Sequence, residues 1–463
     1  MTRPVRVAIV LFTRDLRLHD HPALACAAQS AHAVAPLFVL DPTVLRGFGA
    51  ANRVSFLLAA LRDLRRELRE RGGSLVVRAG DVVEETTRLA LEVGADAVFL
   101  SEDVSAYARA RERRLRRACG QHRIEVRTFA GITVVEPGEI VPANRTHYQV
   151  FTAYWRRWQA APRRPVVAPP RSLRSPAGMR PGRLPAPSDL VPGARSVARP
   201  PGGESEGRSR LRRWLASSLA RYGRLHDDLA ADSTSRLSSY LHFGCVSPLE
   251  VVELAERRRN NDPFVRQLAW RDFYAQLLAA NPELPRSDLR PRGDRWRDDE
   301  EAFAAWKEGR TGIPIVDAGM RQLSREGWMH NRARLVTSSF LTKHLYLDWR
   351  LGAAHYFDLL VDGDVASNVG NWQWVAGTGT DTRPNRFFNP IRQARRFDPE
   401  GEYVRRHVPE LANIDGAAVH EPWRLGRAKP RSYPDPVVEH APAVSRFRRA
   451  RQSGGHAAGD AGA

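Results

Sequence analysis

Cysteine is scarce in this chain of 463 residues. It has three, Cys26, Cys119 and Cys245, which lie far apart and form no CxxC pair. Such a set argues against a disulfide scaffold and a zinc site, and it fits a protein of the reducing cytosol. Long apolar runs are also missing, so no segment has the length of a membrane span. The sequence therefore predicts a cytoplasmic protein without a metal site, long enough for two domains.

Acidic residues are too few to balance the basic ones, because 52 Asp and Glu face 72 Lys and Arg and leave a net charge of +20. Such a charge favours a polyanionic partner, with nucleic acid first and an anionic membrane surface second. A GC-rich genome that uses Arg for Lys would explain part of the same excess. Composition alone leaves these interpretations open.

The dinucleotide motif GxGxxG is absent after the first apolar segment, so an NAD-type Rossmann site is not expected. The N-terminal part nevertheless alternates short apolar runs with amphipathic stretches such as 52–71. The apolar runs are 5–12, 32–41, 73–81 and 96–101. This alternation predicts an α/β domain with a parallel, Rossmann-like sheet that binds ligands at the carboxyl ends of its strands.

Strand-like alternation is nearly absent after Arg208, where the pattern becomes helical. Pro, Arg, Gly and Ser dominate the preceding segment and predict an extended linker wrapped on the surface. We therefore expect four parts, namely an α/β domain (1–132), a Pro/Arg-rich interdomain linker (133–207), a mostly α-helical domain (208–450) and a disordered tail (451–463).

Two polar segments stand out in the helical part. TSRLSSYLHFG begins at Thr234 and offers hydroxyls and backbone amides near a predicted helix start. That arrangement can hold a phosphate, but it also describes an ordinary Ser/Thr cap. In DGDVASNVGNWQW, two carboxylates flank Gly363, and Trp372 and Trp374 point in different directions because they are two residues apart. Packing alone leaves the polar groups of this segment as an unexplained cost.

Two predicted helices place amides beside cations or aromatic rings on one face. The first face carries Asn331, Arg334, Leu335 and Ser338, and the second carries Gln267, Trp270, Arg271 and Tyr274. An amide can read the edge of a base, and a neighbouring ring can stack on a base extruded from DNA. For each helix alone, structural packing explains the pattern equally well.

Taken in order, LFTRDLRLHDHPAL, TSRLS, WRDFY, TGIPIVDAGMRQL, GWMHNR, DGD and NWQW resemble the motifs of the photolyase/cryptochrome family, most closely its class I cyclobutane pyrimidine dimer photolyases. The resemblance covers nearly the whole chain except the linker and tail. It implies an antenna domain of the HUP type and a helical FAD-binding domain. It also implies light-driven DNA repair, in which reduced FAD passes an electron to a flipped-out dimer and recovers it after the ring splits. The implied partner is damaged DNA, bound by a monomer without an obligate protein partner and associated with the bacterial nucleoid.

The resemblance also assigns residues by motif. FAD would be bound by Tyr222, Thr234, Ser235, Arg236, Leu237, Ser238, Arg271, Arg334, Asp362, Gly363, Asp364 and Asn368, the last beside flavin N5. A relay of electrons between flavin and surface would use Trp372, Trp349 and Trp306. The lesion and its DNA would be bound by Gln267, Trp270, Arg271, Tyr274, Asn331, Arg332 and Trp374. Arg383 and Lys343 would add to a basic rim around the lesion.

Some positions depart from the class I pattern. Gln267 stands where many class I enzymes have Glu, and a Gln there also resembles 6-4 photolyases, although those have adjacent histidines where this chain has His330 and Asn331. His226 replaces a DNA-contacting Arg, and Leu335 replaces a Met of similar volume. We expect cyclobutane dimers as the substrate, with 6-4 lesions as the alternative. A cryptochrome-type photoreceptor is the rival, disfavoured by the short tail and by an Asn beside flavin N5.

The antenna chromophore depends on one position. Tyr107 and Ala108 fall where folate-type enzymes carry an Asn-Glu pair. We therefore expect 8-hydroxy-5-deazaflavin rather than methenyltetrahydrofolate, and a second flavin or an empty site are the further alternatives.

Overall fold

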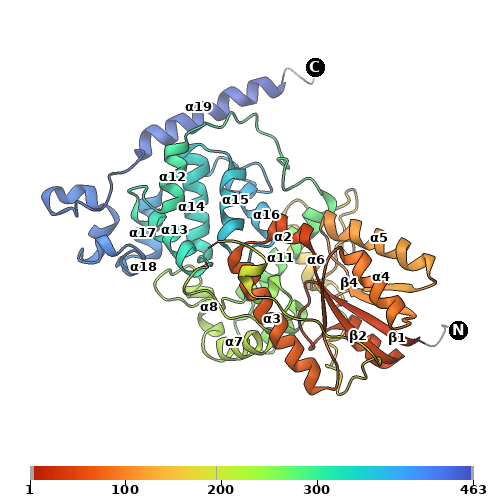
Figure 1. The fold of residues 1–463 in the computed structure, drawn as a ribbon. Coiled ribbons are helices and arrows are strands. Elements are labelled where there is room, and N and C mark those ends of the chain that lie inside the picture. The colour runs from red at the N-terminus through yellow and green to blue at the C-terminus, as the bar shows by residue number, and fades with distance from the viewer. Residues whose placement is uncertain (1–4, 194, 460–463) are drawn as a thin grey trace.

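The N-terminal domain is a parallel sheet between two layers of helices (Figure 1). The computed structural model describes residues 5–193 and 195–459. The strand order is β3-β2-β1-β4-β5, formed by β1 (Val5–Phe12), β2 (Ala31–Leu40), β3 (Val76–Ala79), β4 (Ala97–Ser101) and β5 (Glu125–Phe129). The predicted parallel α/β fold is confirmed. The sequence did not reveal β5, because its residues EVRTF are only partly buried and form no apolar run.

Alternate residues of the strands face two separate cores, as the two-residue period of a strand requires. Val10 and Phe12 belong to the larger core, which continues into the helical domain, whereas Ile9 and Leu11 pack with residues of α4 and α5. The helices of this domain are α1 (Pro22–Ser30), α2 (Pro42–Phe48), α3 (Ala51–Glu70), α4 (Val82–Glu92) and α5 (Ala106–Gln121). The predicted helix over 52–71 matches α3.

The composition of the linker predicted an extended segment, but the linker is not extended throughout. It contains α6 (Phe151–Ala160) and a short 3-10 turn (Pro187–Asp189), and Trp158 of α6 is fully buried. The remainder runs along the first domain, where Val77 N donates to the Pro181 carbonyl at 2.8 Å and thereby pairs the edge strand β3. Pro and Arg dominate the average composition of the linker and conceal the apolar spacing of Phe151, Tyr154 and Trp158, which α6 buries.

The second domain is helical, and its described residues contain no strand. Its first helices are α7 (Glu204–Ser217), α8 (Leu219–Leu225), α9 (Ser238–His242), α10 (Pro248–Glu256), α11 (Asp262–Ala280), α12 (Glu300–Glu308), α13 (Pro314–Glu326) and α14 (Asn331–Ser339). They are followed by the π-helical turn η2 (Phe340–Leu345), α15 (Trp349–Leu359), α16 (Val365–Ala376), α17 (Pro390–Phe397), α18 (Glu402–His407), the 3-10 turns Pro409–Leu411, Gly416–His420 and Pro422–Ala428, and α19 (His440–Gly459).

The turn after β1 joins the two domains. Leu16 N donates to the Phe243 carbonyl at 3.1 Å, and Arg17, itself buried, donates to the Gly244 carbonyl at 3.0 Å. Gly244 has φ +63°, and a Cβ there would lie 1.9 Å from the Arg14 carbonyl oxygen. Only glycine allows this approach. The junction brings Arg14 to the helical domain. The motif LFTRDLRLHD therefore lies close to the other motifs in the structure, although it is far from them in sequence.

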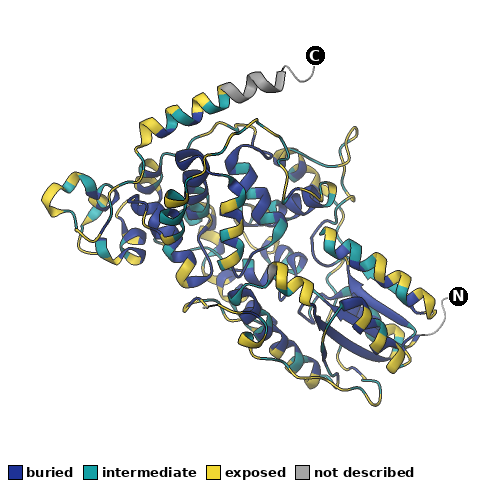
Figure 2. Cartoon of the chain, turned by 45° about the horizontal axis from the view of Figure 1, so that its top comes forward, coloured by how far each residue is buried: buried dark blue, intermediate teal, exposed yellow. Residues whose placement is uncertain are grey.

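The C-terminal helix α19 lies on the outside of the helical domain, and burial gathers in the domain centre and along the sheet (Figure 2). α19 continues to Gly459, so the segment expected to be disordered from residue 451 is helical as far as it is described. Residues 460–463 lie outside the described residues. Among the described residues no helix is long and apolar enough to cross a membrane.

Candidate active site

A cavity of about 400 Å³ opens in the helical domain, where α8, α9, α11, α14 and α16 converge. Most residues predicted to bind cofactor or DNA line it together. These are Tyr222, Thr234, Ser235, Ser238, Gln267, Trp270, Arg271, Tyr274, Asn331, Arg334, Asp362, Asp364 and Trp374. The two helix faces read from the sequence thus meet across one cavity, although Ser338 turns away and donates to the Arg334 carbonyl at 2.6 Å.

The buried wall of the cavity carries polar atoms that the chain leaves unpaired. Among the described residues, Thr234 Oγ1 and Asp362 Oδ1 are buried and have no hydrogen-bond partner. Each such atom costs about 1–3 kcal/mol unless a ligand or water satisfies it. The wall is therefore built to receive a polar ligand with donors for the carboxylate and an acceptor for the hydroxyl, and the donors and acceptors of FAD fit these residues.

Two arginines neutralise the carboxylates of the DGD segment. Arg334 donates to Asp362 at 2.8 Å, and Arg14 lies 2.5 Å from Asp364. Burial opposes ionisation of Asp364, but Arg14 and Arg271 outweigh it and hold the pKa of Asp364 well below its usual range. Burial likewise opposes the charge of Arg14, yet Asp103 and Asp364 raise the pKa of Arg14 above its ordinary value. Both groups are therefore charged across the physiological range.

Sequence reasoning missed Arg14, Asp103 and His242 at this site. Arg14 comes from the turn after β1 and bridges Asp364 to Asp103, which lies 3.5 Å away after β4. His242 lines the cavity, and burial together with Arg14 lowers the pKa of His242 to about 3, so its ring is neutral at neutral pH. The family motif around Arg14 was the available signal, but only the fold shows that it reaches a site 350 residues further along.

The cavity mouth is aromatic and supported from behind. Trp270 stacks on Phe151 of α6 with ring centroids 3.7 Å apart and an interplanar angle of 7°. Tyr274 donates to Asn371 at 3.3 Å, and Trp374 of α16 also lines the cavity. Trp372, two residues earlier, is buried and points elsewhere, as the spacing predicted. The mouth thus offers two half-buried indoles to a flat ligand.

Five of the residues predicted to bind FAD or the lesion do not line the cavity. Arg236 pairs with Glu326 at 2.9 Å and lies over Trp328, Leu237 is buried, and Arg332 pairs with Asp227 at 2.5 Å. Asn368 is buried and donates to the Ala353 carbonyl at 3.2 Å. A Cβ at Gly363 would lie 2.7 Å from Arg53 Nη1, so this glycine admits that buried guanidinium. These residues support the walls, and their predicted ligand contacts stay predictions.

The predicted relay of tryptophans lacks a surface end. Trp372, Trp349 and Trp306 are all buried, and Trp306 has no exposed area. Trp306 and Trp372 are neighbours, with ring centroids 6.1 Å apart. A different indole, Trp296, is partly exposed and packs on Tyr346 at 5.0 Å, three residues before Trp349. A relay that ends at Trp306 would therefore end at a buried indole, and the assignment of Trp306 stays a prediction.

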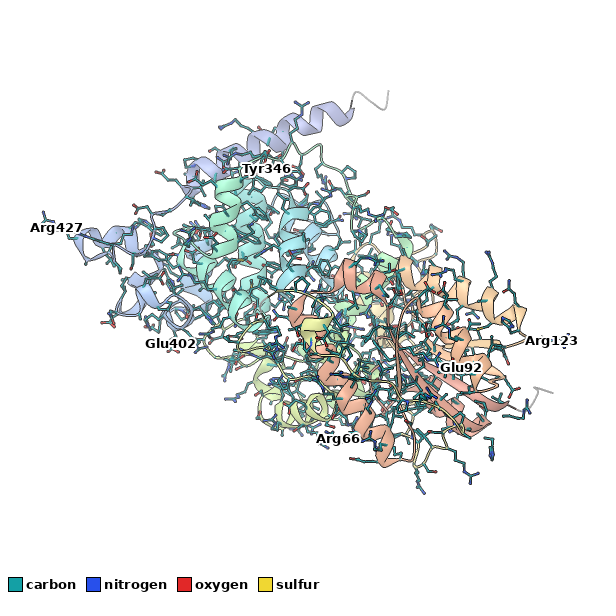
Figure 3. All side chains as sticks on the ribbon, viewed as in Figure 1. Arg66, Glu92, Arg123, Tyr346, Glu402 and Arg427 are labelled. Carbon is teal, nitrogen blue, oxygen red and sulfur yellow. The ribbon has the colours of Figure 1, made fainter. Side chains whose placement is uncertain are left out.

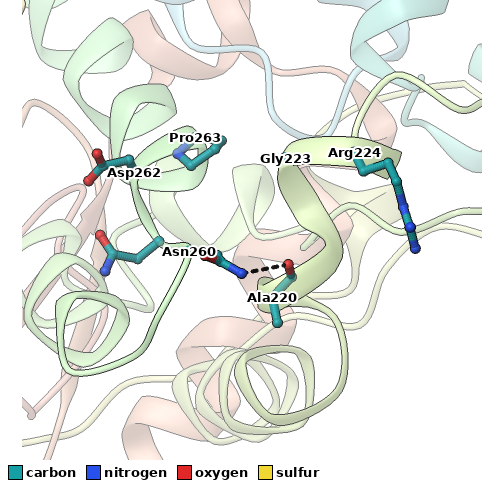
Figure 4. A pocket seen from close by; sticks show the side chains of 7 residues that line it. Ala220, Gly223, Arg224, Asn260, Asp262 and Pro263 are labelled. Atoms are coloured by element: carbon teal, nitrogen blue, oxygen red, sulfur yellow. Dashed lines mark hydrogen bonds between the residues drawn. The ribbon is translucent and has the colours of Figure 1, made fainter.

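A second hollow of about 520 Å³ lies beside the first, between α8 and the start of α11 (Figure 4). Its lining includes Gly223, Arg224, Asn260 and Pro263, and Asn260 donates to the Ala220 carbonyl at 3.5 Å. Arg224 and Asn260 are exposed, and none of its lining residues that the structure describes carries a buried side-chain atom without a partner. The smaller cavity is therefore the better candidate for the reaction.

Comparisons with known proteins agree with this geometry. The family model described as DNA photolyase matches residues 8–172, and the FAD binding domain of DNA photolyase matches residues 264–453. A deoxyribodipyrimidine photo-lyase of Streptomyces griseus is 52% identical over 96% of this chain and 99% of its own length.

The chain belongs to the DNA photolyase family. A crystal structure of a bacterial class III photolyase from Agrobacterium tumefaciens superposes with a TM-score of 0.90 at 33% identity, covering 98% of this chain and 99% of that one. A cryptochrome DASH of Danio rerio is 35% identical over 97% of this chain and 93% of its own length. The predicted family, the two-domain fold and light-driven DNA repair by a photo-lyase are confirmed, as is an FAD-binding domain. Among the described residues no cluster of side chains could hold a metal.

Proposed function

We propose that this photolyase splits cyclobutane pyrimidine dimers that are flipped out of DNA into the 400 Å³ cavity. The observation that carries the proposal is the division of one cavity into two parts. Its wall has unpaired polar atoms and charged pairs suited to a cofactor, and its mouth has Trp270 and Trp374 suited to a lesion. A dimer is already badly stacked, so its extrusion costs less than the few kcal/mol of a normal base.

FAD would be held by groups that the fold has already positioned. Thr234, Ser235 and Ser238 stand at the start of α9, where hydroxyls and free backbone amides suit phosphates. Asp362 offers its unpaired oxygen to a ring donor, and Arg334 keeps that carboxylate in place. Bound in reduced form, the cofactor would supply the light-driven electron that breaks the cyclobutane bonds. The chain orients both reactants and excludes water.

The lesion would be held by rings and amides of the mouth. Trp270 is fixed against Phe151, so it offers a rigid face for stacking. Gln267 and Asn331 line the same mouth and can each give and accept hydrogen bonds at a pyrimidine edge. The amide of Gln267 carries no charge, and this leaves both a cyclobutane dimer and a 6-4 lesion chemically acceptable. Of the two photolyase classes, I and III, we propose class I for this chain, and the proposal depends only on the sequence motifs.

For electron supply to the flavin we propose the order Trp372, Trp349 and Trp296. Trp372 lies on α16, and its Nε1 is buried without a partner among the described residues. Trp349 donates to Asp288 at 2.9 Å, and Trp296 is a partly exposed indole that packs on Tyr346, three residues before α15. Exposure allows an external reductant to reach Trp296.

The antenna is proposed to be 8-hydroxy-5-deazaflavin in the N-terminal domain. At the carboxyl ends of the strands, Tyr107 of α5 donates to Asp41, which caps α2. Tyr107 thus occupies the expected folate position with its hydroxyl already engaged. Extraction of the chromophore from purified protein and its absorption spectrum test this assignment, and a folate spectrum would contradict it.

The deciding experiment uses reduced protein and an oligonucleotide with a single thymine cyclobutane dimer, in paired light and dark samples. Chromatography should show intact thymines in the light only. A second oligonucleotide with a 6-4 lesion should stay unrepaired. Repair of the second substrate alone would make the protein a 6-4 photolyase, and repair of neither despite bound reduced flavin would favour a photoreceptor. Sedimentation in the same buffer tests the proposed monomer.

A further inference from the structure

The sequence suggested that Lys343 belongs to a basic rim around the lesion, but the structure places this side chain in the interior. It lies in the π-helical turn η2 and is only 2% exposed. Its ammonium donates to the Pro384 carbonyl at 3.2 Å and also to the Arg386 carbonyl. Both acceptors belong to the 377–389 loop, which connects α16 to α17. A buried charge thus binds the backbone of a loop rather than DNA.

The 377–389 loop carries cationic side chains to the cavity mouth. The Arg386 guanidinium lies 5.4 Å from the ring centroid of Trp374, the indole that lines the cavity. Arg386 is exposed, and its nearest carboxylate is Asp381 at 3.8 Å. Arg386 can therefore reach a phosphate beside a lesion that stacks on Trp374.

Several contacts fix this loop, and its start is held by hydrogen bonds from Arg290 N to the Thr378 carbonyl at 2.7 Å and from Arg292 to the Gly377 carbonyl at 3.2 Å. Besides Lys343, Phe387 packs on His344 with ring centroids 4.5 Å apart. Gly377 has φ +83°, and a Cβ there would lie 2.3 Å from the Pro384 carbonyl oxygen. Lys343 is the residue that donates to the carbonyls of Pro384 and of Arg386 itself.

We propose that Lys343 is a positioning residue for DNA: its ammonium holds the 377–389 loop so that Arg386 stays over Trp374 at the cavity mouth. The inference rests on the proposed function of this mouth in lesion binding. In this proposal Lys343 contacts neither DNA nor flavin and acts through the loop alone. Loss of the ammonium should free the loop and weaken binding of the lesion more than binding of undamaged DNA, because undamaged DNA does not stack on Trp374.

The charge of Lys343 depends on groups from three segments. Burial, Arg451 of α19 and Arg386 lower its pKa to about 7, whereas Asp381 and Asp294 favour the charged form. Hydrogen bonds from a charged donor are about twice as strong as neutral ones. The loop should therefore be held firmly at pH 6 and less firmly at pH 8.5.

The test compares Lys343→Met with Lys429→Met, which removes the same charge from a pair with Asp435 at the surface. Dark binding of a dimer-containing oligonucleotide and of its undamaged counterpart is measured for each. We expect Lys343→Met to weaken dimer binding about tenfold, the loss of one good contact of about 1.4 kcal/mol, and undamaged binding far less. Lys429→Met should match the wild type. Equal dimer affinity of wild type and Lys343→Met would overturn the proposal.

Hydrogen exchange of amides in the loop provides a readout that does not depend on lesion binding. Lys343→Met should lower protection in residues 382–389 and leave α16 unchanged. If that variant does not fold, protection in the wild type is compared at pH 6 and 8.5, with a correction for intrinsic exchange. Equal protection at both pH values would then overturn the proposal that Lys343 holds the loop. If the wild type binds no lesion but its loop responds as expected, the proposed function is refuted, whereas the contact by which Lys343 holds the loop is supported.

Discussion

Among single residues, Asp364 connects the two domains and the cavity. Its carboxylate pairs with Arg14 and accepts from Ser367 N at 2.8 Å, which caps α16. Removing one partner of a buried pair leaves the other charge uncompensated, at a cost of about 3–5 kcal/mol. Asp364→Asn should therefore lower the free energy of unfolding by about 3 kcal/mol and release FAD. Denaturant titration and the flavin content of purified protein measure both effects.

The control for Asp364 is Glu283→Gln, which breaks an exposed pair with Arg286 and should change stability by less than about 1 kcal/mol. Asp364→Asn with wild-type stability and full flavin content would show that Asp103 alone compensates the charge of Arg14, and the electrostatic account of Asp364 would then fail.

The revised relay gives a second residue-scale prediction. Trp296→Phe should slow light-driven reduction of oxidised flavin several-fold, because the remaining indoles of the relay, Trp349 and Trp372, are buried from external reductants. Trp306→Phe should leave that rate nearly unchanged, although it removes the bond from Nε1 to the Thr337 carbonyl and so lowers stability by about 1–3 kcal/mol. The flavin absorption of illuminated samples is the measurement. The opposite ranking of the two variants would restore Trp306 to the relay.

At the scale of elements, α6 ties the linker to the cavity. Phe151 stacks on Trp270, and Trp158 Nε1 donates to the buried carboxylate of Asp272 at 2.9 Å. Phe151→Ala should lower the free energy of unfolding by about 3–5 kcal/mol and weaken dimer binding, since Trp270 loses its support. Val150→Ala, at a 41% exposed neighbour, is the matched control and should do neither. Denaturation and dark binding report the two effects, and intact dimer affinity in Phe151→Ala would separate α6 from recognition.

Helical spacing was enough to predict the faces of α11 and α14, because the residues concerned repeat at three and four positions. It could not show that Arg236 and Arg332 are engaged by Glu326 and Asp227, since those carboxylates lie about 90 and 105 positions away. The helix α6 was not predicted for a different reason, namely that the linker was assigned from its average composition rather than from local apolar spacing. Local periodicity and long-range pairing are thus separate kinds of information, and the sequence of one chain carries mainly the first.

For the whole molecule, buried histidines determine the response to acid. Burial lowers the pKa of His242, His344 and His407 to about 3, against about 6.5 in an unfolded chain. Between pH 6.5 and 3 the unfolded state therefore binds more protons, so stability falls as the pH is lowered. Glu136, whose pKa burial raises to about 7, acts in the opposite sense between about pH 4 and 7, as do Asp272 and Asp398, whose pKa values burial raises to about 6. These three acids are outnumbered, because burial also lowers the pKa values of His330 and His355 to about 4.

We therefore expect Tm to fall steadily from pH 6.5 to pH 4. His407→Gln should make that fall shallower, because the substituted side chain cannot take up a proton on unfolding. His122→Gln, at an exposed position, should leave the slope unchanged. Calorimetry across this range measures the slopes, and a Tm that rises toward pH 4 would mean that the buried carboxyls dominate.

The net charge of +20 belongs to the whole surface, and salt can show which part of it meets DNA. Arg383 is exposed on the loop at the cavity mouth, whereas Arg123 lies at the far end of the N-terminal domain (Figure 3). Each phosphate contact contributes about 0.9 to the slope of log affinity against log salt. Arg383→Gln should lower that slope by about 1 and weaken damaged and undamaged DNA alike, whereas Arg123→Gln should change neither. Binding titrations at several salt concentrations decide the matter. An equal effect of the two variants would place DNA along the N-terminal domain as well, and the excess charge would then serve DNA binding over the whole molecule rather than at the rim of its cavity.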